Sequence, residues 1–344
     1  MPDPLPCVGQ KSYPTIVSPL QSDGYTLLES LSEKDKPWDK HRKHADIIAG
    51  YYRQGGMEAH ADRVSQCSQL LEFKEVPDGQ TGARKLKLAS THFCRVRHCP
   101  ICQWRRSLQW KARAYENLPR VVTDYPGGRW IFLTLTMKNC LLEDLRETLA
   151  HLNQSFRRLS QLKAFPGIGW IKSVEITRGR DGKSAHPHLH CLILLKDSYY
   201  KEDYLSKADW IALWKQCLRV DYCPVLDVKA IHAESSPVGL IAEILKYQCK
   251  ESDMVVSAEW FLEYVKQVHG TRAVGVGGVL REYFKQLEEE PEDLVGHDDQ
   301  ATEETKGPSI YFRWHRSFKK YVMVQLTSAG VVLPTPLKSY DNTG

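Results

Sequence analysis

The apolar residues between positions 130 and 290 follow two periods, one typical of strands and one typical of helices. Residues 130–136 form a continuous apolar and β-branched run, which predicts a buried strand. Apolar side chains that recur every three or four positions predict an amphipathic helix over 142–159. The same criteria predict further strands at 171–177, 186–195 and 225–230, and further helices at 201–217, 238–250, 258–269 and 279–286.

From residue 130 onward, the order of these elements is β-α-β-β-α-β-α. This order is similar to the ferredoxin-like split βαβ arrangement, in which helices cover one face of an antiparallel sheet. The predicted fold class is therefore α+β with an antiparallel sheet. The dipeptide Asp181-Gly182 lies between the second and third strands and favours a tight two-residue hairpin there.

Composition shifts along the chain predict five regions. Nine acidic residues and no Lys or Arg occur between 288 and 304, which is typical of a linker. The first 60 residues are polar and rich in Pro and Lys, which indicates a partly ordered arm. The predicted regions are an N-terminal arm (1–60), a cysteine module (61–120), the sheet domain (125–287), the acidic linker (288–308) and a basic, aromatic C-terminal segment (309–344) that includes a strand at 321–332.

The overall composition is that of a globular protein, with 42% hydrophobic and 26% charged residues in 344. The apolar runs are much shorter than the roughly 20 residues that a membrane helix needs. The N-terminus has no basic start followed by an apolar stretch, so we expect a cytoplasmic protein that is not secreted.

The cysteine module is strongly basic. Residues 91–115 contain six Lys or Arg and no acidic residue, interleaved with Trp104, Trp110 and Tyr115. Such a mixture can contact phosphates and stack on nucleobases. The alternative is a solvated basic helix face.

Four of the ten cysteines are spaced like metal ligands. Cys99 and Cys102 are separated by two residues, so both thiolates can point at one tetrahedral zinc ion, and Cys94 lies just upstream. Cys67 is the expected fourth ligand because the strand-like residues 84–88 can fold back between it and the other three. His98 and His92 are alternatives for that position. Four protein ligands leave no open position, so we predict a structural zinc module.

Three histidines are expected to share one face of a strand. His186, His188 and His190 alternate with other residues in the predicted strand 186–195, so their imidazoles project to the same side. A hairpin centred on Asp181-Gly182 places Glu175 directly opposite His188 on that side. Imidazoles beside a carboxylate predict an open site for a divalent metal ion.

The predicted helix 238–250 carries a second candidate pair. Glu243 and Tyr247 are four residues apart and therefore share one face of that helix. Lys250 and its neighbour Lys246 are suited to hold a phosphate or to stabilise a phenolate. A Glu and a Tyr at this spacing are common, so the pair alone has little specificity.

Taken together, these motifs resemble those of a known family. Residues 132–136, Pro187–His190 and 243–250, preceded by the cysteines, are similar to the ordered motifs of rolling-circle plasmid replication initiators. These are Rep proteins of the HUH endonuclease superfamily, in the branch with one catalytic tyrosine and one glutamate. The resemblance covers about residues 67–253.

The resemblance implies a mechanism. His188 and His190, with Glu175 or His186, would hold Mn²⁺ or Mg²⁺ against the scissile phosphate. Tyr247 would attack and form a 5′-phosphotyrosine, and Glu243 would activate water in the terminating cleavage. Single- and double-stranded DNA at the plasmid origin are the implied partners. Because the sequence lacks a G-x-x-x-x-G-K-[ST] loop, a host helicase and DNA polymerase are implied too. No membrane partner is expected, and an oligomer is compatible with the sequence.

Three other functions compete with this interpretation. A tyrosine transposase or mobilisation relaxase shares the histidines and the tyrosine but cuts different DNA. A non-catalytic zinc regulator would bind DNA without forming a covalent adduct. A metal-dependent hydrolase of small substrates is disfavoured by the basic and aromatic segments.

Overall fold

The computed structural model describes residues 21–22, 25–77, 84–231, 245, 248–289, 291, 294–295, 308–327 and 330–332. The chain divides into two compact units that each combine distant segments. The first unit comprises Met1–Asp39, Leu70–Ser90 and Ala301–Gly344, and the second comprises Lys40–Gln69 and Thr91–Gln300. Each unit draws on segments from several of the five predicted regions, and the chain passes between the two units several times.

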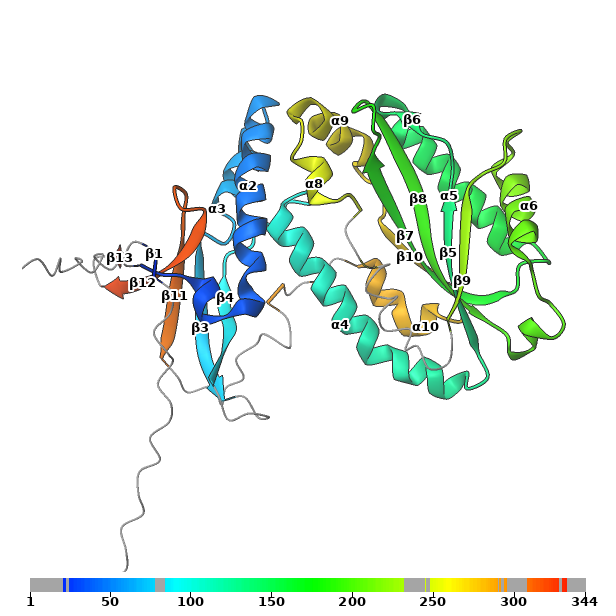
Figure 1. Cartoon of the computed structure of the whole chain (residues 1–344), viewed down its shortest axis with the longest axis horizontal. Helices are drawn as coiled ribbons and strands as arrows, with labels where there is room; N and C mark the ends of the chain where they lie inside the picture. The colour runs from blue at the N-terminus through cyan, green and yellow to red at the C-terminus, as the bar shows by residue number, and fades with distance from the viewer. Residues whose placement is uncertain are drawn as a thin grey trace, which may run out of the picture. The chain divides into compact units, whose positions relative to one another are not determined.

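The first unit is built on a five-stranded sheet in the order β13-β12-β11-β3-β4 (Figure 1). The Phe73 and Phe312 rings meet edge to face at 5.8 Å, and so do the Trp38 and Tyr321 rings at 6.3 Å. The C-terminal aromatic residues thus form a core with the N-terminal part of the chain. The elements are β1 (Gln21–Ser22), β2 (Tyr25–Thr26), α1 (Leu28–Leu31), η1 (Glu33–Asp35), β3 (Leu70–Pro77), β4 (Arg84–Thr91), β11 (Ser309–His315), β12 (Lys320–Thr327) and β13 (Gly330–Val332).

One prediction for the C-terminal part of the chain needs correction, and the predicted N-terminal arm contains helices. The single strand predicted at 321–332 is two strands, β12 and β13, which pair antiparallel. Within the predicted arm, α2 (Pro37–Gln54) is an eighteen-residue helix, and α3 (Glu58–Gln66) follows it. Buried residues of α2 recur every three or four positions once the buried polar residues are included, so the signal was partly hidden by polar side chains: Trp38, His41, Arg42, Ala45, Ile48, Ala49 and Tyr52.

The second unit contains a six-stranded antiparallel sheet whose main path is β10-β7-β8-β5-β9, with the short β6 paired to β8. The four predicted strands are present, and β7 and β8 extend beyond their predicted limits. The strands are β5 (Arg129–Thr136), β6 (Cys140–Leu141), β7 (Gly167–Arg178), β8 (Ser184–Leu195), β9 (Leu226–Ile231) and β10 (Val274–Gly278).

The sequence pattern did not predict the edge strand β10, because this strand is rich in glycine. Its sequence is Val-Gly-Val-Gly-Gly, and glycine is disfavoured in strand interiors. The glycines have a packing role, since a Cβ on Gly277 would collide with the Trp170 indole. The bare backbone therefore lets a large ring of β7 lie across the edge strand.

Most predicted helices are present. The predicted helix 201–217 begins later, because Ser206 and Asp209 form a capping box at its true start. The predicted helix 238–250 lies mostly outside the described residues, and its end is not helical, because Cys249 forms a β-bridge with Ile176 of β7. The helices of this unit are α4 (Pro100–Asp124), η2 (Leu142–Asp144), α5 (Leu145–Gln161), η3 (Asp197–Tyr200), α6 (Lys207–Leu218), α8 (Glu251–Met254), α9 (Ala258–Val268), α10 (Arg281–Phe284) and η4 (Lys285–Glu288).

Helices cover both faces of this sheet, and not one face as the sequence pattern predicted. On one face, Phe156 of α5 packs edge to face against Trp170 of β7 at 5.0 Å. On the other face, α4 and α10 bury a core with the strands that includes Leu118, Phe132 and Phe284 (Figure 1). The physical reason is the continuous burial of Cys191–Leu195, which requires cover on both sides.

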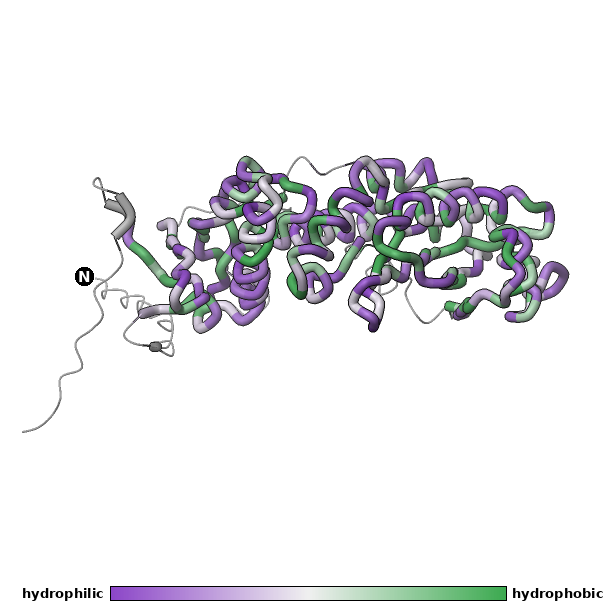
Figure 2. Tube along the Cα trace, turned by 90° about the horizontal axis from the view of Figure 1, so that it is seen from above, coloured by the Kyte–Doolittle hydropathy of each residue, from purple (hydrophilic) through white to green (hydrophobic). Residues whose placement is uncertain are grey.

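Hydrophobic and hydrophilic positions alternate along the tube within both units (Figure 2). Among the described residues, no helix combines the length and apolar character that a membrane crossing requires. The apolar residues are instead used in the two cores, as in a globular protein.

Candidate functional site

The four cysteines predicted as zinc ligands converge at the end of α3 and the start of α4. Cys67 is the C-cap residue of α3 and Cys99 is the N-cap residue of α4. Cys102 lies in the first turn of α4, and its Sγ is 3.6 Å from Cys67 Sγ and 3.7 Å from Cys94 Sγ. All four sulfur atoms lie within 4.8 Å of one another, and all four residues are buried.

Two arginines hold the backbone around the cysteines. Arg42, which is fully buried, donates to the Cys67 carbonyl at 3.0 Å, and Arg63 donates to the Cys94 carbonyl at 2.5 Å. The Cys94 backbone N–H donates to Cys67 Sγ at 3.4 Å, as amides do toward thiolates. Hydrogen bonds from Cys102, Cys94 and Cys99 hold the pKa of the Cys67 thiol well below its usual value.

This donor set suits a metal such as zinc. Four buried sulfur atoms at mutual contact match a closed tetrahedral site, and a thiolate is the form that binds metal. The alternative fourth ligands are not part of the group: His98 is buried beside Tyr264 with ring centroids 5.3 Å apart, and His92 is exposed.

A second cluster lies on the β7–β8 hairpin. Glu175 is directly opposite His188, as the sequence predicted. The connection is longer than the predicted two-residue turn, because Gly179 N–H bonds to the Ser184 carbonyl and Gly182 adopts φ +73°. The longer loop preserves the predicted register, so the carboxylate and the imidazoles share one face of the sheet.

Two imidazole nitrogens converge on one carboxylate oxygen. Glu175 Oε2 is 2.9 Å from His190 Nε2 and 3.5 Å from His188 Nε2. The three side chains are 10–13% exposed, so they are shielded but reachable from solvent. Although burial alone raises the pKa of Glu175, hydrogen bonds from His188 and His190 lower it well below its usual range.

The other ring nitrogens face polar neighbours. His188 Nδ1 is 3.3 Å from the His186 carbonyl oxygen, and His190 Nδ1 is 3.3 Å from the Thr134 hydroxyl. A proton on His188 Nδ1 can donate to that carbonyl, which leaves the Nε2 lone pair directed at Glu175. A lone pair facing a carboxylate requires a cation between them, so the arrangement fits a divalent metal ion as well as a proton.

Of the other predicted site residues, the structure describes His186 and Lys250. The Nδ1 atom of His186 is 2.8 Å from Asn139 Oδ1, and His186 is outside the three-residue cluster. The Lys250 Nζ atom lies 3.4 Å from Glu175 Oε1. Glu243 and Tyr247 lie outside the described residues.

The chain that follows position 247 is attached to the strand that carries Glu175. Ile176 N–H donates to the Gln248 carbonyl at 2.7 Å, and Cys249 bridges to the same residue. Arg97 donates to Gln248 Oε1 at 2.9 Å and to the Thr271 carbonyl at 2.6 Å. Residues 248–250 are therefore held beside the cluster of Glu175, His188 and His190, which is called the metal-type cluster below.

Sequence reasoning missed a buried acid–imidazole contact next to this segment. Glu251 is 5% exposed, its Oε2 lies 2.8 Å from His44 Nδ1, and its Oε1 forms a short contact with His41 Nδ1. The His41 ring stacks on Trp104 at 4.5 Å. The available signal was the placement of His41 and His44 one helical turn apart in α2, but their partner is more than 200 residues away.

Comparisons with known proteins place the chain in a family. The family model Rep_1, described as "Replication protein", matches residues 85–322. "Protein rep" of Bacillus amyloliquefaciens is 31% identical over 339 residues, covering 87% of this chain and 98% of that protein. "Protein rep" of Lactiplantibacillus plantarum is 32% identical over 318 residues, covering 86% and 98%. No solved structure matches the chain. Because the family model spans more than half of the chain and these relatives align over almost their full length, the chain belongs to the Rep_1 family of replication proteins.

Proposed function

We propose that this replication protein nicks one DNA strand at a plasmid origin and thereby starts rolling-circle replication. The observation that carries the proposal is the convergence of Glu175, His188 and His190 beside the chain segment that begins at Gln248. The strand order β7-β8-β5-β9 supports a ferredoxin-like HUH nuclease core, because a split βαβ unit has this order.

His188, His190 and Glu175 are the proposed ligands of Mn²⁺ or Mg²⁺. A divalent ion bound there would polarise the scissile phosphate and neutralise charge that develops on its oxygens. Three protein ligands leave positions open for a phosphate, in contrast to a closed four-ligand site. His186 is the weaker candidate because its Nδ1 atom contacts Asn139 and it lies outside the cluster.

Tyr247 is the proposed nucleophile. Consecutive Cα atoms are about 3.8 Å apart, and its neighbour Gln248 is bonded to β7 one residue from Glu175. The phenolic oxygen would form a bond to phosphorus while the bond to the 3′ oxygen breaks, which leaves a 5′-phosphotyrosine and a 3′-hydroxyl. Lys250 stands at 3.4 Å from the Glu175 carboxylate, where its charge can attract the phosphate backbone.

Glu243 is proposed to act at termination. Hydrolysis of the strand needs water, and water needs a base, whereas initiation uses the tyrosine itself. A base of this kind lets the protein release the DNA instead of joining it through a second tyrosine. Extension of the free 3′-hydroxyl and strand separation would then fall to a host DNA polymerase and helicase.

The cysteine cluster is proposed to hold structural zinc. It ties the end of α3 to the start of α4, the helix that covers the sheet face on which His188 and His190 lie. Four protein ligands would leave no position for substrate, so this site supports the fold and takes no part in the chemistry.

The test is a covalent-adduct assay with the full chain. The protein is incubated with Mn²⁺ and a labelled single-stranded oligonucleotide that carries the plasmid origin, and the products are separated on a denaturing gel. We expect a protein–DNA adduct with wild type and with Tyr204→Phe, an exposed control, and none with Tyr247→Phe.

Three outcomes would contradict this function. Binding without any adduct would favour a non-catalytic zinc regulator. Cleavage of transposon ends or a transfer origin, but not of the replication origin, would favour a transposase or relaxase. An adduct of normal yield in Tyr247→Phe would assign the nucleophile to another tyrosine.

A further inference from the structure

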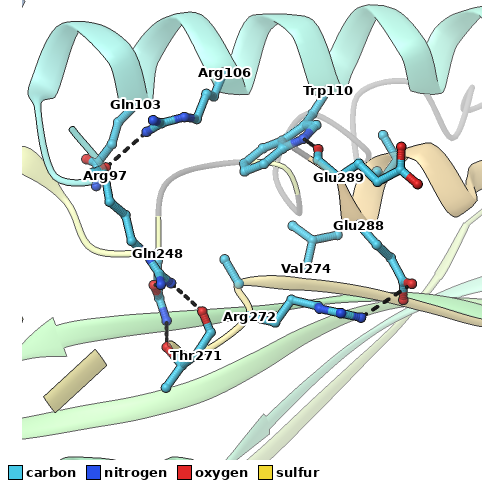
Figure 3. Close-up of a pocket in the computed structure, with 12 residues that line it drawn as sticks. Arg97, Gln103, Arg106, Trp110, Gln248, Thr271, Arg272, Val274, Glu288 and Glu289 are labelled. Atoms are coloured by element: carbon cyan, nitrogen blue, oxygen red, sulfur yellow. Dashed lines mark hydrogen bonds and ion pairs between the residues drawn. The ribbon is translucent and has the colours of Figure 1, made fainter. Parts of the chain in front are cut away.

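A cavity of about 130 Å³ lies in the second unit between α4, the segment that starts at Gln248, and β10. Figure 3 shows Gln103, Arg106 and Trp110 projecting from α4, with Gln248, Thr271 and Arg272 on the opposite wall. Apolar side chains of Val274 and Leu287 complete the lining. The cavity is separate from both ligand clusters, and the function proposed above does not use it.

One wall of the cavity carries a buried hydrogen-bond acceptor, the side-chain oxygen of Gln103. Gln103 is 9% exposed, and its Oε1 has no hydrogen-bond partner within the part of the chain that the structure describes. A buried amide oxygen that lacks a donor carries an uncompensated desolvation penalty. A ligand that brings an N–H group into the cavity would remove this penalty.

Aromatic and cationic groups border the same space. Trp110 is half-buried, and its Nε1 donates to the Glu289 carbonyl at 3.3 Å, which holds the indole in place. Arg97, Arg106 and Arg272 contribute three positive charges, against Glu288 and Glu289. Glu288 is itself engaged by Arg272 at 3.5 Å and by the Val276 N–H at 3.1 Å. The cavity therefore combines the aromatic face of Trp110, the hydrogen-bond acceptor of Gln103 and a border with net positive charge.

The sheet register relates this cavity to the metal-type cluster. Ser173 of β7 is paired with Val274 of β10 on one side and with His190 of β8 on the other. Directly paired residues project to the same face, so the cavity and the cluster lie on one side of the sheet. Two interstrand spacings of about 4.8 Å place Val274, which lines the cavity, roughly 10 Å from His190. Neighbouring nucleotides of an extended single strand can span that separation.

We propose that this cavity binds one unpaired nucleobase of the single-stranded DNA, stacked on Trp110 and with an N–H of its edge bonded to Gln103 Oε1. This inference rests on the proposed function, because the base belongs to the strand whose phosphate lies at the Glu175 cluster. Every nucleobase has a π-face, and each carries at least one N–H in single-stranded DNA, so the pocket accepts more than one base. Arg272 lies at the rim, where its charge meets a flanking phosphate.

The first experiment is photocrosslinking with a defined probe. The full chain is mixed with oligo(dT) that carries one central 5-iododeoxyuridine, irradiated, digested and mapped by mass spectrometry. We expect the main crosslink on Trp110. Excess thymidine monophosphate should reduce it only in part, because a free nucleotide carries the base but lacks the flanking phosphates. Crosslinks confined to other residues would overturn the inference.

The second experiment measures the affinity for oligo(dT) by fluorescence anisotropy. Trp110→Leu should weaken binding about tenfold, which is the effect of losing one stacked base, and Trp110→Phe should recover most of it. Gln103→Leu should weaken binding less, by roughly fivefold. Gln109→Leu is the matched control, because Gln109 is on the same helix and is 7% exposed but does not line the cavity. Equal affinity of Gln103→Leu, Gln109→Leu and wild type would exclude the Gln103 contact.

Folding and function are checked separately. Thermal unfolding of each variant identifies a loss of affinity that comes from misfolding, and Trp110→Phe keeps the stacking test valid if Trp110→Leu is unstable. The adduct assay with the origin oligonucleotide is run on the same wild-type preparation. An adduct without any Trp110 crosslink refutes the base pocket alone, whereas a Trp110 crosslink without an adduct refutes the nicking function alone.

Discussion

The two ligand clusters of the second unit differ in their donor atoms, in their burial and in the secondary structure that carries them. The cysteine cluster brings four sulfur atoms together at the ends of two helices, with each cysteine at most 4% exposed. The histidine cluster brings one carboxylate and two imidazoles together on paired strands, with side chains 10–13% exposed. Four buried donors complete a tetrahedron, while three partly exposed donors leave room for a substrate atom. The comparison distinguishes a donor set suited to a closed metal site from one suited to an open metal site.

The largest expected effect is loss of the cysteine cluster. Cys99→Ser removes a buried ligand at the start of α4, and structural zinc sites supply about 10–16 kcal/mol in small zinc-dependent domains. We expect about one zinc per wild-type chain, and loss of both zinc and cooperative unfolding in the variant, measured by metal analysis and thermal denaturation. The exposed Cys223→Ser should retain both. Full zinc retention in Cys67→Ser would point instead to His98 or His92.

The next largest effect is expected for substitutions in the histidine cluster, which should leave the fold intact. His190→Ala removes a proposed metal ligand, so adduct formation should fall by at least about a hundredfold while zinc content and thermal stability stay near wild type. His186→Ala should have a smaller effect, because His186 contacts Asn139 outside the cluster. A gel time course over a range of Mn²⁺ concentrations measures both. Equal losses for the two variants would contradict the three-ligand assignment, and full cleavage after chelation would contradict the metal role.

A second acid–imidazole group, Glu251 with His41 and His44, lies outside both ligand clusters and provides a contrast to them. Burial opposes ionisation of Glu251, but hydrogen bonds from His41 and His44 lower its pKa overall. A lowered pKa in the folded state stabilises the protein above the usual glutamate value of about 4.5. That stability is lost as the pH falls through the folded-state pKa.

We therefore expect Glu251→Gln to reduce stability at pH 7 by about 1–3 kcal/mol, because the buried imidazoles lose their charged partner. Between pH 5 and pH 3, wild type should lose more stability than Glu251→Gln. Denaturant titrations at each pH provide the measurement. A difference between the two proteins that stays constant over this range would rule out stabilisation by the ionised Glu251 carboxylate.

The smallest effect is expected for Lys250→Ala. The Lys250 side chain is 58% exposed and contacts Glu175 at 3.4 Å, so solvent screens the pair. Stability should change by less than about 0.5 kcal/mol, and adduct formation should slow by roughly threefold at low salt, with less effect at high salt. Kinetics at two ionic strengths test this. A loss of adduct formation as large as that of His190→Ala would indicate that Lys250 acts together with the proposed metal ligands.

Local features of the sequence were sufficient to predict which residues gather in both clusters. The two-residue spacing of Cys99 and Cys102 and the alternation of His188 and His190 are short-range patterns, and strand and turn geometry convert them directly into side-chain directions. The pairing of Glu175 with His188 followed from the hairpin, although the loop proved longer than expected. The membership of Cys67 was also predicted, because it was the upstream cysteine that a folded-back strand could bring close.

Long-range packing was decided only in the tertiary structure. The C-terminal Phe312 and Tyr321 join a core with Phe73 and Trp38, which no local pattern encodes because apolar surfaces pack without direction. The position of α4 on the second sheet face, the contact of His41 and His44 with Glu251, and the cavity beside Trp110 arise in the same way. Short-range geometry thus determined the ligand clusters, whereas burial of distant apolar surface determined the two units and the cavity between α4 and the sheet.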